Sequence, residues 1–337
     1  MPARRRTPSS VDVARKAGVS QSAVSRTFTP GASVAPETRA KVHAAASALG
    51  YRPNVIPRIM LTDRSDIVAV IVGGFYNPFY AATLEAFTLA LHAAGKQIML
   101  VQVESDRALD EILEKLSGYR VDAVLSALSI LSPEVARALS AFRIPIVTLN
   151  SETSGKWIRT VSSDNEGAGF AAARVLHARG GTRFAYIGGP EDSPAQMQRG
   201  EGFRHALQEL GIKECAFARG NYDHDGGYAA ARELFSGRKR PDALFCANDL
   251  TALGAIDALR DGFGLDVPSD VQVIGYDNIP AASWPPYRLS SFDQDVEAMV
   301  SHAMSLMDID GPEPAAKIVA AKFIERDSTG ARIRTES

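Results

Sequence analysis

From residue 66 onward, short apolar segments alternate with longer segments that have the amphipathic or alanine-rich character of helices. The apolar segments are Ile67–Val72, Gln97–Val103, Ala123–Leu128, Ile144–Leu149, Phe184–Ile187, Ala243–Cys246 and Val271–Ile274. Short strands that are apolar on both faces and separated by helices are typical of parallel sheets covered by helices. The segments divide near residue 162 into two comparable series. The pattern therefore predicts an α/β body of two similar parallel-sheet lobes rather than one large sheet.

The carboxyl ends of these predicted strands indicate where a ligand would bind. In open α/β sheets, ligands bind beyond the carboxyl ends of the strands. Two lobes that face each other would form a cleft between them. Its predicted lining is Gly74–Tyr80, Asn150, Asn248–Asp249 and Tyr276–Asn278.

The first 60 residues differ from the rest of the chain in charge. They contain ten Lys and Arg and two acidic residues, a net charge of +8, whereas the remainder carries −10 and the whole chain −2. The length of 337 residues suits two or three domains. A cationic segment joined to an anionic body favours a polyanion-binding module attached to a separate body. The alternative is an ordinary solvated charged face.

Within this basic segment, residues 11–28 have the pattern of a helix-turn-helix motif. Ser9 is a candidate N-cap with Asp12 three residues later, and Gly18 allows the positive φ of a tight turn. Ser20 would cap a second helix. The polar face of that helix comprises Gln21, Ser22, Ser25, Arg26 and Thr29, and its inward side comprises Val24 and Phe28. One packed face and one polar face fit a helix that reads base edges, and a small generic helical bundle is the alternative.

A third helix is expected to begin at Pro36 and to stop at Gly50. Its apolar residues Val42, Ala45, Ala46 and Leu49 recur at helical spacing. The proline-containing stretch 51–65 then reads as a linker. The sequence thus predicts an all-α head over residues 1–50, a linker over 51–65 and a two-lobed body over 66–337.

The chain resembles transcription regulators of the lactose-repressor and galactose-repressor type (the LacI/GalR family). In the head, the resemblance rests on residues 12–26, on Pro36-Glu-Thr-Arg39 and on Leu49-Gly-Tyr-Arg-Pro-Asn54. In the body it rests on Asn77-Pro-Phe79, Ser163-Asp-Asn165, Ile187-Gly-Gly-Pro190, Arg199-x-x-Gly-Phe203, Cys246-Ala-Asn-Asp249 and Ile274-Gly-Tyr-Asp277. Each string is weak alone, but together, in this order over residues 9–327, they are specific. The resemblance implies a ligand-responsive repressor that binds a pseudo-palindromic operator in double-stranded DNA as a homodimer.

The resemblance assigns roles in DNA binding residue by residue. Gln21, Ser22 and Arg26 would enter the major groove, with Arg26 the best candidate for bidentate contact with guanine. The residues expected at phosphates are Ser9, Ser20, Ser25 and Arg39. Residues 54–61 correspond to a hinge helix that orders on DNA, and its expected contacts are Asn54, Arg58 and Met60. Met60 stands where the family usually presents a leucine, Pro57 where it has a small helix former, and Ala35 where it has a capping serine.

The body resembles periplasmic sugar-binding proteins, in which three chain crossings join two lobes. We expect these crossings near 161–163, 289–293 and 318–322. Lobe 1 would then comprise approximately 66–161 and 293–320, and lobe 2 approximately 162–290 and 321–327. By resemblance, the effector contacts are Phe79, Tyr80, Asn150, Arg199, Tyr222, Asn248, Asp277, Trp284 and Gln294. Aromatic walls with Asp, Asn, Gln and Arg suit a sugar, a sugar acid or another small metabolite, although Asn150-Ser151 replaces the Asp-Arg pair frequent in sugar binders of this fold.

Other classes of protein fit the sequence less well. No pyrophosphate-binding glycine pattern, phosphate loop or nucleophile elbow is present, so an enzyme is not expected. The six histidines have no metal-ligand spacing, and neither a metal nor a cofactor is expected. His224, between two aspartates, is interpreted as solvated surface. Without a secretory signal or an apolar membrane span, and with two isolated cysteines, a cytoplasmic protein is expected. A free-standing solute-binding protein and an α/β enzyme with an accessory head are the alternatives.

Overall fold

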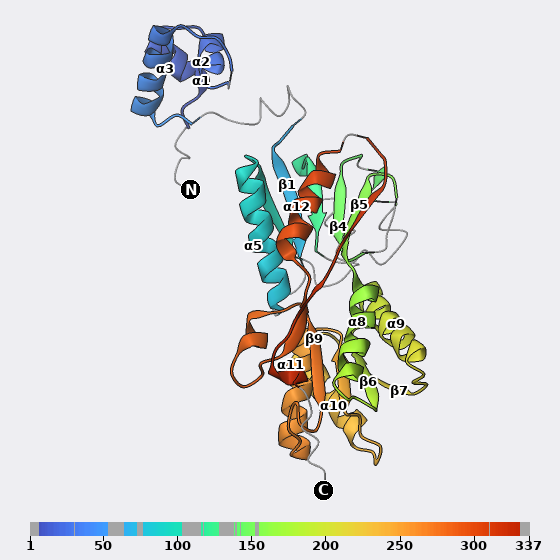
Figure 1. The fold of residues 1–337 in the computed structure, drawn as a ribbon. Helices are drawn as coiled ribbons and strands as arrows, with labels where there is room; N and C mark the ends of the chain where they lie inside the picture. Colours follow the sequence, from blue (N-terminus) through green and yellow to red (C-terminus); the bar gives the residue numbers. More distant parts are fainter. Residues whose placement is uncertain are drawn as a thin grey trace. The chain divides into compact units, whose positions relative to one another are not determined.

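The computed structural model describes residues 7–29, 31–52, 64–72, 77–102, 116, 118–127, 138, 140–141, 143–151, 155–309 and 311–330. The chain divides into two compact units, Met1–Ser65 and Asp66–Ser337. The first unit is all-α, and the second holds two sheets covered by helices (Figure 1). The predicted fold class, a helix-turn-helix head and an α/β body of two parallel-sheet lobes, is confirmed.

The head consists of α1 (Ser10–Ala17), α2 (Gln21–Thr27) and α3 (Pro36–Leu49). The capping box at its start is confirmed, because the Ser9 side chain accepts from the Asp12 amide and the Asp12 carboxylate accepts from the Ser9 amide. Gly18 ends α1 at φ 66°, in the left-handed region that favours glycine. The core is a small apolar cluster of Val13, Ala14, Val24, Val42, Ala45 and Ala46. Ala35 precedes α3 without a side-chain cap.

The first lobe of the body holds a six-stranded, wholly parallel sheet in the order β11-β5-β4-β3-β1-β2. Its strands are β1 (Ile67–Val72), β2 (Gln97–Gln102), β3 (Ala123–Ser126), β4 (Ile146–Leu149), β5 (Ile158–Ser163) and β11 (Ala315–Val319). The helices α5 (Pro78–Ala93) and α12 (Val296–Met307) lie side by side on one face (Figure 1). They bury the apolar cluster that includes Val70, Phe87, Leu125 and Met299.

The second lobe holds a six-stranded sheet in the order β12-β10-β9-β8-β6-β7. Its strands are β6 (Phe184–Gly188), β7 (Cys215–Arg219), β8 (Ala243–Cys246), β9 (Gln272–Tyr276), β10 (Ser290–Asp293) and β12 (Lys322–Ile324), of which only β12 runs antiparallel to its neighbour. Helices α8 (Asn165–Ala178) and α9 (Pro194–Glu209) cover one face, and α10 (His224–Phe235) and α11 (Asp249–Asp257) cover the other. The short helices η1 (Ala258–Gly262), η2 (Pro280–Ser283) and η3 (Asp327–Thr329) complete the lobe.

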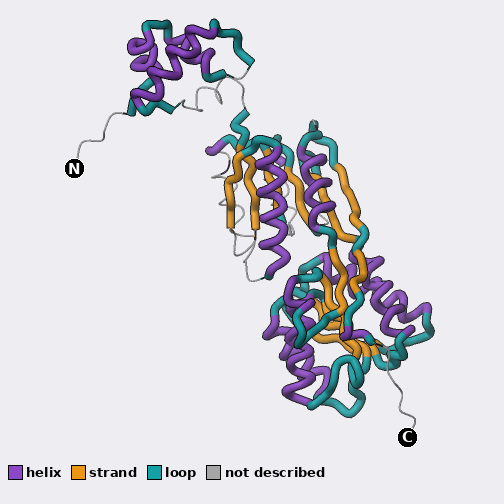
Figure 2. The backbone as a smooth tube through the Cα atoms, turned by 60° about the vertical axis from the view of Figure 1, so that its left-hand side comes forward, coloured by secondary structure: helices purple, strands orange, loops and turns teal. Residues whose placement is uncertain are grey.

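Three extended segments join the lobes, as Figure 2 shows for the path of the backbone. The chain leaves the first sheet at the end of β5, returns after β10 and crosses again between β11 and β12. The carboxyl ends of the central strands of both sheets therefore face the space between the lobes. Any site in that space receives residues from both lobes and from the crossings.

All seven predicted strands are present, but five further strands were not predicted. These are β5, β7, β10, β11 and β12. They are edge strands or strands next to an edge, and their sequences mix polar with apolar residues, as in Ser290-Ser-Phe-Asp293. A criterion of short apolar segments finds the strands with apolar sequences, the edge strand β2 among them, and misses those that carry polar residues.

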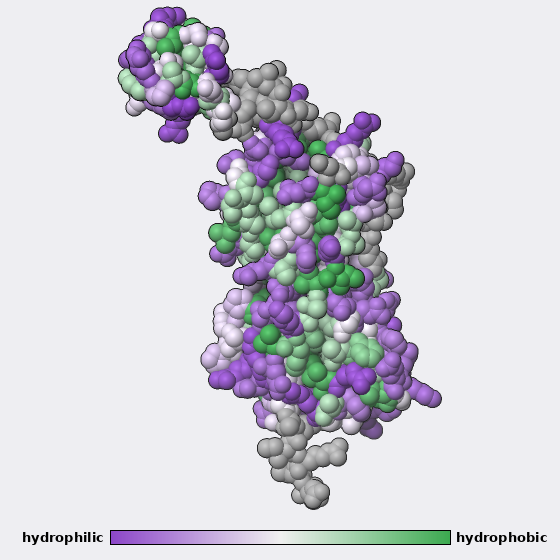
Figure 3. Space-filling view, turned by 45° about the horizontal axis from the view of Figure 1, so that its top comes forward, coloured by the Kyte–Doolittle hydropathy of each residue, from purple (hydrophilic) through white to green (hydrophobic). Residues whose placement is uncertain are grey.

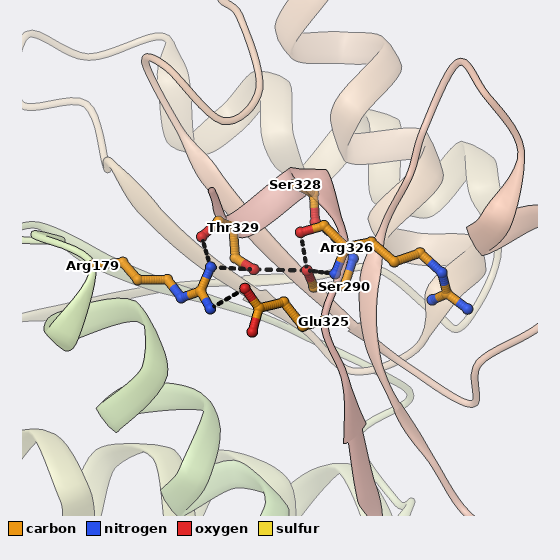
Figure 4. A network of polar contacts seen from close by, with 6 residues as sticks. All are labelled: Arg179, Ser290, Glu325, Arg326, Ser328 and Thr329. Atoms are coloured by element: carbon orange, nitrogen blue, oxygen red, sulfur yellow. Dashed lines mark hydrogen bonds and ion pairs between the residues drawn. The ribbon is translucent and has the colours of Figure 1, made fainter. Parts of the chain in front are cut away.

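The C-terminal segment 325–329 is fastened to the second lobe by a polar network (Figure 4). Arg179, which follows α8, donates to the Thr329 carbonyl and forms an ion pair with Glu325 at 2.6 Å. The Ser290 hydroxyl lies within 2.7 Å of the Thr329 hydroxyl, and the Ser290 amide donates to the Ser328 hydroxyl. The network anchors the segment that follows β12, and thereby the third crossing, to one lobe.

The surface visible in Figure 3 is mainly hydrophilic, with hydrophobic side chains in small groups. None of the helices in the described part of the chain has the length and apolar character needed to cross a membrane.

Candidate functional site

Helix α2 of the head presents the polar face that the sequence predicted. Ser20 caps it by accepting from the Ala23 amide at 3.2 Å, and Val24 is completely buried against α1 and α3. The outward residues Gln21, Ser22, Ser25 and Arg26 are all exposed. The buried apolar side fixes the rotation of the helix about its axis, so these four side chains are accessible together. A major groove admits an α-helix that presents such a face.

The residues expected at phosphates have internal partners as well. The hydroxyl of Ser9 donates to Asp12 at 2.7 Å, the hydroxyl of Ser20 lies 2.9 Å from that of Ser22, and Arg39 donates to the Ala32 carbonyl at 3.3 Å. Capping therefore accounts for Ser9 and Ser20 without any ligand. The expected hinge contacts Asn54, Arg58 and Met60 lie outside the described residues.

The cleft between the lobes contains a cavity of about 70 Å³. Of the nine residues expected at an effector, eight line it: Phe79, Tyr80, Asn150, Arg199, Tyr222, Asn248, Asp277 and Gln294. Asn77, Ala127, Ser193 and Ala195 also line it and were not predicted as contacts. Asn77 lies within the predicted cleft lining Gly74–Tyr80, whereas Ser193 was not placed there. Ser193 precedes Pro194, which opens α9, and this is the sequence signal that could have placed it at the cleft.

Trp284 does not line this cavity, and its expected contact with an effector stays a prediction. It ends η2, where Ala282 supplies the buried contact and the indole turns outward with 56% of its surface exposed. The sequence places Trp284 close to the cleft loop Tyr276–Asn278 but cannot show which way the indole points, because the short helix η2 lies between that loop and Trp284.

Arg199 lies beneath the cavity and is 3% exposed. Its Nε donates to Asn165 at 2.8 Å, one terminal nitrogen donates to the Ala247 carbonyl, and its guanidinium carbon lies 3.5 Å from the centroid of the Tyr276 ring. These contacts, supplied by α8, β8 and β9, hold the planar guanidinium in one orientation. Arg199 is therefore a buried cation with a fixed orientation and not a solvated surface residue.

Asp277 is the carboxylate of the cavity. The side-chain amide of Gln294 donates to it at 2.6 Å. Burial raises the pKa of Asp277 to about 6, and the positive charge of Arg199 together with hydrogen bonds from Gln294 and Asn77 partly oppose this increase. Its backbone has φ 105°, and Asn150 and Tyr222 also have positive φ, so strained conformations gather around the cavity.

Aromatic and amide side chains complete the walls. Phe79 is 7% exposed and packs edge-to-face with Tyr80, with their ring centroids 5.6 Å apart. The Tyr222 hydroxyl lies 2.8 Å from that of Ser193. Asn248 caps α11 by accepting from the Thr251 amide and donates to the Tyr222 carbonyl, so it orders the loop that carries Tyr222.

A second hollow, of about 350 Å³, shares Phe79 and Asp277 with the cavity. Its charged lining is Asp293, Asp295, Glu297 and Lys322. Lys322 pairs with Asp295 at 2.8 Å. This groove therefore has a negative balance of charge and adjoins the cavity at Phe79 and Asp277.

The arrangement suits binding rather than covalent chemistry. The cavity offers hydrogen-bond donors and acceptors beside aromatic faces, which is the composition of a site for a small polar ligand. Among the residues that the structure describes, no group of His, Cys, Asp and Glu could hold a metal ion. His224 is interpreted from sequence as solvated, and it is indeed partly exposed, but it contacts Asp257 at 3.0 Å, an acceptor that Tyr287 also shares.

Comparison with known proteins gives an independent test of this assignment. Residues 11–54 match the model of the bacterial regulatory proteins of the lacI family, and residues 173–329 match that of a periplasmic binding protein-like domain. The lac repressor dimer bound to operator and the anti-inducer ONPF superposes with a TM-score of 0.85 at 24% identity, over 96% of this chain and 99% of that one. That likeness supports the fold.

Relatives with higher identity extend over nearly the whole chain. The transcriptional regulator CelR of Thermobifida fusca is 34% identical over 306 residues, 88% of this chain and 89% of CelR. The HTH-type transcriptional repressor PurR of Proteus mirabilis is 30% identical over 303 residues, 88% of each chain. A structure of CelR with cellobiose superposes with a TM-score of 0.71 at 32% identity, over 95% of this chain and 99% of that one. These relatives regulate transcription and are not enzymes. The chain belongs to the LacI family of bacterial regulatory proteins.

Proposed function

We propose that this protein is a ligand-responsive repressor that binds a pseudo-palindromic DNA site as a homodimer. The observation that carries the proposal is the exposed row of Gln21, Ser22, Ser25 and Arg26 on α2, opposite the fully buried Val24. A dimer would present two such helices to two half-sites of one operator. A function on bacterial DNA implies a cytoplasmic location.

In this proposal the chain is organised as a DNA-binding head (1–50), a linker with a hinge (51–65) and an effector-binding and dimerisation body (66–337). Arg26 reads a base edge with Gln21 and Ser22, while Ser9, Ser20, Ser25 and Arg39 face phosphates. Asn54, Arg58 and Met60 contact the DNA from the hinge. The division of the chain into two compact units at residue 65 supports the distinction between head and body.

The effector is proposed to be an uncharged sugar bound by the eight predicted residues that line the cavity. The cavity holds one cation, Arg199, and one carboxylate, Asp277, so it has no excess positive charge for a sugar acid or a phosphate. The outer groove adds three carboxylates against one lysine, which repels anions further. A two-ring sugar, such as the cellobiose bound by CelR, would extend from the cavity into the groove. Since ligand pockets usually measure about 300 to 1,000 Å³, a cavity of 70 Å³ requires movement to admit a ring.

The DNA-binding part is tested by selecting bound duplexes from a random-sequence pool with the full-length protein. We expect the pool to converge on an inverted repeat. Arg26→Ala should reduce the preference for the selected sequence about 5- to 150-fold, the range for loss of one bidentate base contact. Lys41→Ala, which removes an exposed cation paired with Glu37 on α3, is the matched control and should retain the preference. Convergence on no sequence, or equal losses in both variants, would refute the assignment.

The effector is tested by a thermal-shift screen of the full-length protein. The panel pairs neutral mono- and disaccharides with the corresponding sugar acids and phosphates. Stabilisation by neutral members alone, lost in Arg199→Ala and Asp277→Ala, is the expected result. Preferential stabilisation by the anions would contradict the proposed class of effector.

A further inference from the structure

Five polar side chains around the effector cavity form a closed ring that joins both lobes and two of the three crossings. The backbone amide of Ser163 donates to Oδ1 of Asn150 at 2.9 Å, and Nδ2 of Asn150 donates to Oε1 of Gln294 at 2.9 Å. Nε2 of Gln294 then donates to Oδ1 of Asp277 at 2.6 Å. Tyr276, covalently joined to Asp277, closes the ring, because its hydroxyl lies 2.7 Å from the Ser163 hydroxyl.

Each member of this ring stands at the carboxyl end of a strand or directly after it. Asn150 follows β4 of the first lobe, and Tyr276 and Asp277 end and follow β9 of the second. Ser163 ends β5 at the first crossing, and Gln294 follows β10 at the second crossing. Strands β4 and β5 pair within the first sheet and β9 and β10 within the second, so the ring links these two strand pairs across the lobes.

The direction of each hydrogen bond from Ser163 through Asn150 and Gln294 to Asp277 is determined. A backbone amide can only donate, so the atom of Asn150 that faces Ser163 is the carbonyl oxygen. This turns the Asn150 amino group toward Gln294 and, in turn, the Gln294 amino group toward the Asp277 carboxylate. In such a chain each bond polarises the next, and removal of one member leaves buried partners unsatisfied.

The ring members divide into two groups. Asn150, Gln294 and Asp277 line the effector cavity, whereas Ser163 and Tyr276 do not. Ser163 is 2% exposed and Tyr276 is fully buried, so a ligand in the cavity cannot touch either of them without a rearrangement. Arg199 reinforces this second group, because it stacks on Tyr276 and binds Asn165, two residues beyond Ser163.

We propose that this polar ring locks the first and second crossings together as one mechanical unit, with Ser163 and Tyr276 as positioning residues that respond to contacts made at Asn150, Gln294 and Asp277. An effector that takes over a hydrogen bond of the three cavity residues alters the ring, and the alteration reaches both crossings at once. The lock is a property of the protein by itself. It therefore holds or fails independently of the effector's identity and of DNA binding.

The test is hydrogen exchange, followed by mass spectrometry, on the full-length protein without DNA or sugar. Ser163→Ala removes the bond to Tyr276 and keeps the backbone amide. We expect exchange to accelerate about 2- to 10-fold, the factor for one net hydrogen bond, in residues 160–166 and also in residues 291–296 around Gln294. Residues 291–292 can also respond through Tyr276, which pairs and stacks with Phe292, so the readout of the ring is exchange at residues 294–296, where Gln294 bonds to Asn150 and Asp277.

Two control variants and a double-mutant cycle test whether the effect is specific to the ring. Ser162→Ala alters the neighbouring residue, and Tyr186→Phe removes a buried tyrosine hydroxyl that donates to the Gln196 carbonyl outside the ring. Neither should change exchange in residues 294–296. Tyr276→Phe should reproduce Ser163→Ala, and the double variant should be no faster than either single one, since both remove the same bond. Unchanged exchange at 294–296 in Ser163→Ala and Tyr276→Phe, or equal acceleration by the controls, would overturn the proposal.

Discussion

Asp277→Asn should stabilise the body at neutral pH, although it removes the carboxylate of the effector cavity. Burial raises the pKa of Asp277 from the ordinary 3.8 to about 6, so the folded protein holds the charged form at a cost. Because a tenfold change in a proton equilibrium corresponds to about 1.4 kcal/mol, the cost at pH 7 is about 3 kcal/mol. Asparagine keeps an acceptor for Gln294 but loses the acceptor for Asn77, and this lost hydrogen bond reduces the gain in stability by about 1 kcal/mol. The expected net gain in the free energy of unfolding is about 2 kcal/mol.

The pH dependence distinguishes this reasoning from a simple packing effect. A raised folded-state pKa means that the native state binds the proton more tightly than the unfolded chain, so wild-type stability relative to the variant falls as pH rises from about 4 to about 6. The advantage of Asp277→Asn should therefore be largest at pH 7.5 and should disappear near pH 4.

The assay is urea denaturation of wild type and variant at both pH values, followed by tryptophan fluorescence. Both tryptophans, Trp157 and Trp284, belong to the body, so the signal does not report on the head. Asp293→Asn is the matched control, since Asp293 accepts from Asn278 and from the Asp295 amide, and we expect that variant to be destabilised. A variant at Asp277 that is less stable than wild type at pH 7.5, or that differs equally at both pH values, would refute the argument.

Three further predictions concern other parts of the chain. Ser9→Ala should destabilise the head by about 1 kcal/mol through loss of the capping box, visible as an earlier helical transition in circular dichroism, while Ser22→Ala should not. Arg159→Leu should lower the free energy of unfolding of the body by about 3 kcal/mol or more, because the fully buried guanidinium donates to the carbonyls of Leu306, Gly311 and Glu313. A loss below about 1 kcal/mol would show that these carbonyls find other partners. The hydrogen bond to the Asp257 carboxylate raises the pKa of His224, so Asp257→Asn should return that pKa toward its ordinary value in an NMR titration. The contribution of the contact between His224 and Asp257 to stability is complete below pH about 6.5 and is lost as pH rises through the folded pKa of His224.

The head illustrates how far local sequence rules extend. Ser9, Asp12, Gly18 and Ser20 act within one turn of the residues that specify them, so capping and glycine patterns placed α1 and α2 correctly. The rotation of α2 followed from Val24 in the same way. Local hydrogen bonds and a 3.6-residue period need no knowledge of distant contacts.

The strands were harder to find where their sequences contain polar residues. β1 and β8 are apolar throughout and were predicted, whereas β5 and β10 carry serines and charged residues and were not, although both are largely buried. Both strands end at a crossing between the lobes, and their buried polar residues form specific hydrogen bonds, as Ser163 does with Tyr276 and Ser290 with Thr329. The edge position of β11 removes the requirement for apolar residues on both faces.

The candidate site shows the same division. Residue types and the resemblance to a known family predicted eight side chains that line one cavity, but they also named Trp284, which does not line it, and passed over Ser193. Whether a side chain near the cleft points inward depends on the local path of the backbone, as η2 demonstrates by turning Trp284 to solvent.

The order of the residues by itself determined the class of the molecule: a basic helix-turn-helix head, two lobes of parallel sheet and the carboxyl-end location of the cleft all follow from periodicity, capping and charge. Only the tertiary structure decided the ring through Ser163, Asn150, Gln294, Asp277 and Tyr276. Its hydrogen bonds join residues up to 144 positions apart, as between Asn150 and Gln294. Such contacts exist only after two sheets and their crossings have been brought together, because a hydrogen bond is decided within a few tenths of an ångström and no local pattern encodes a distance of that kind.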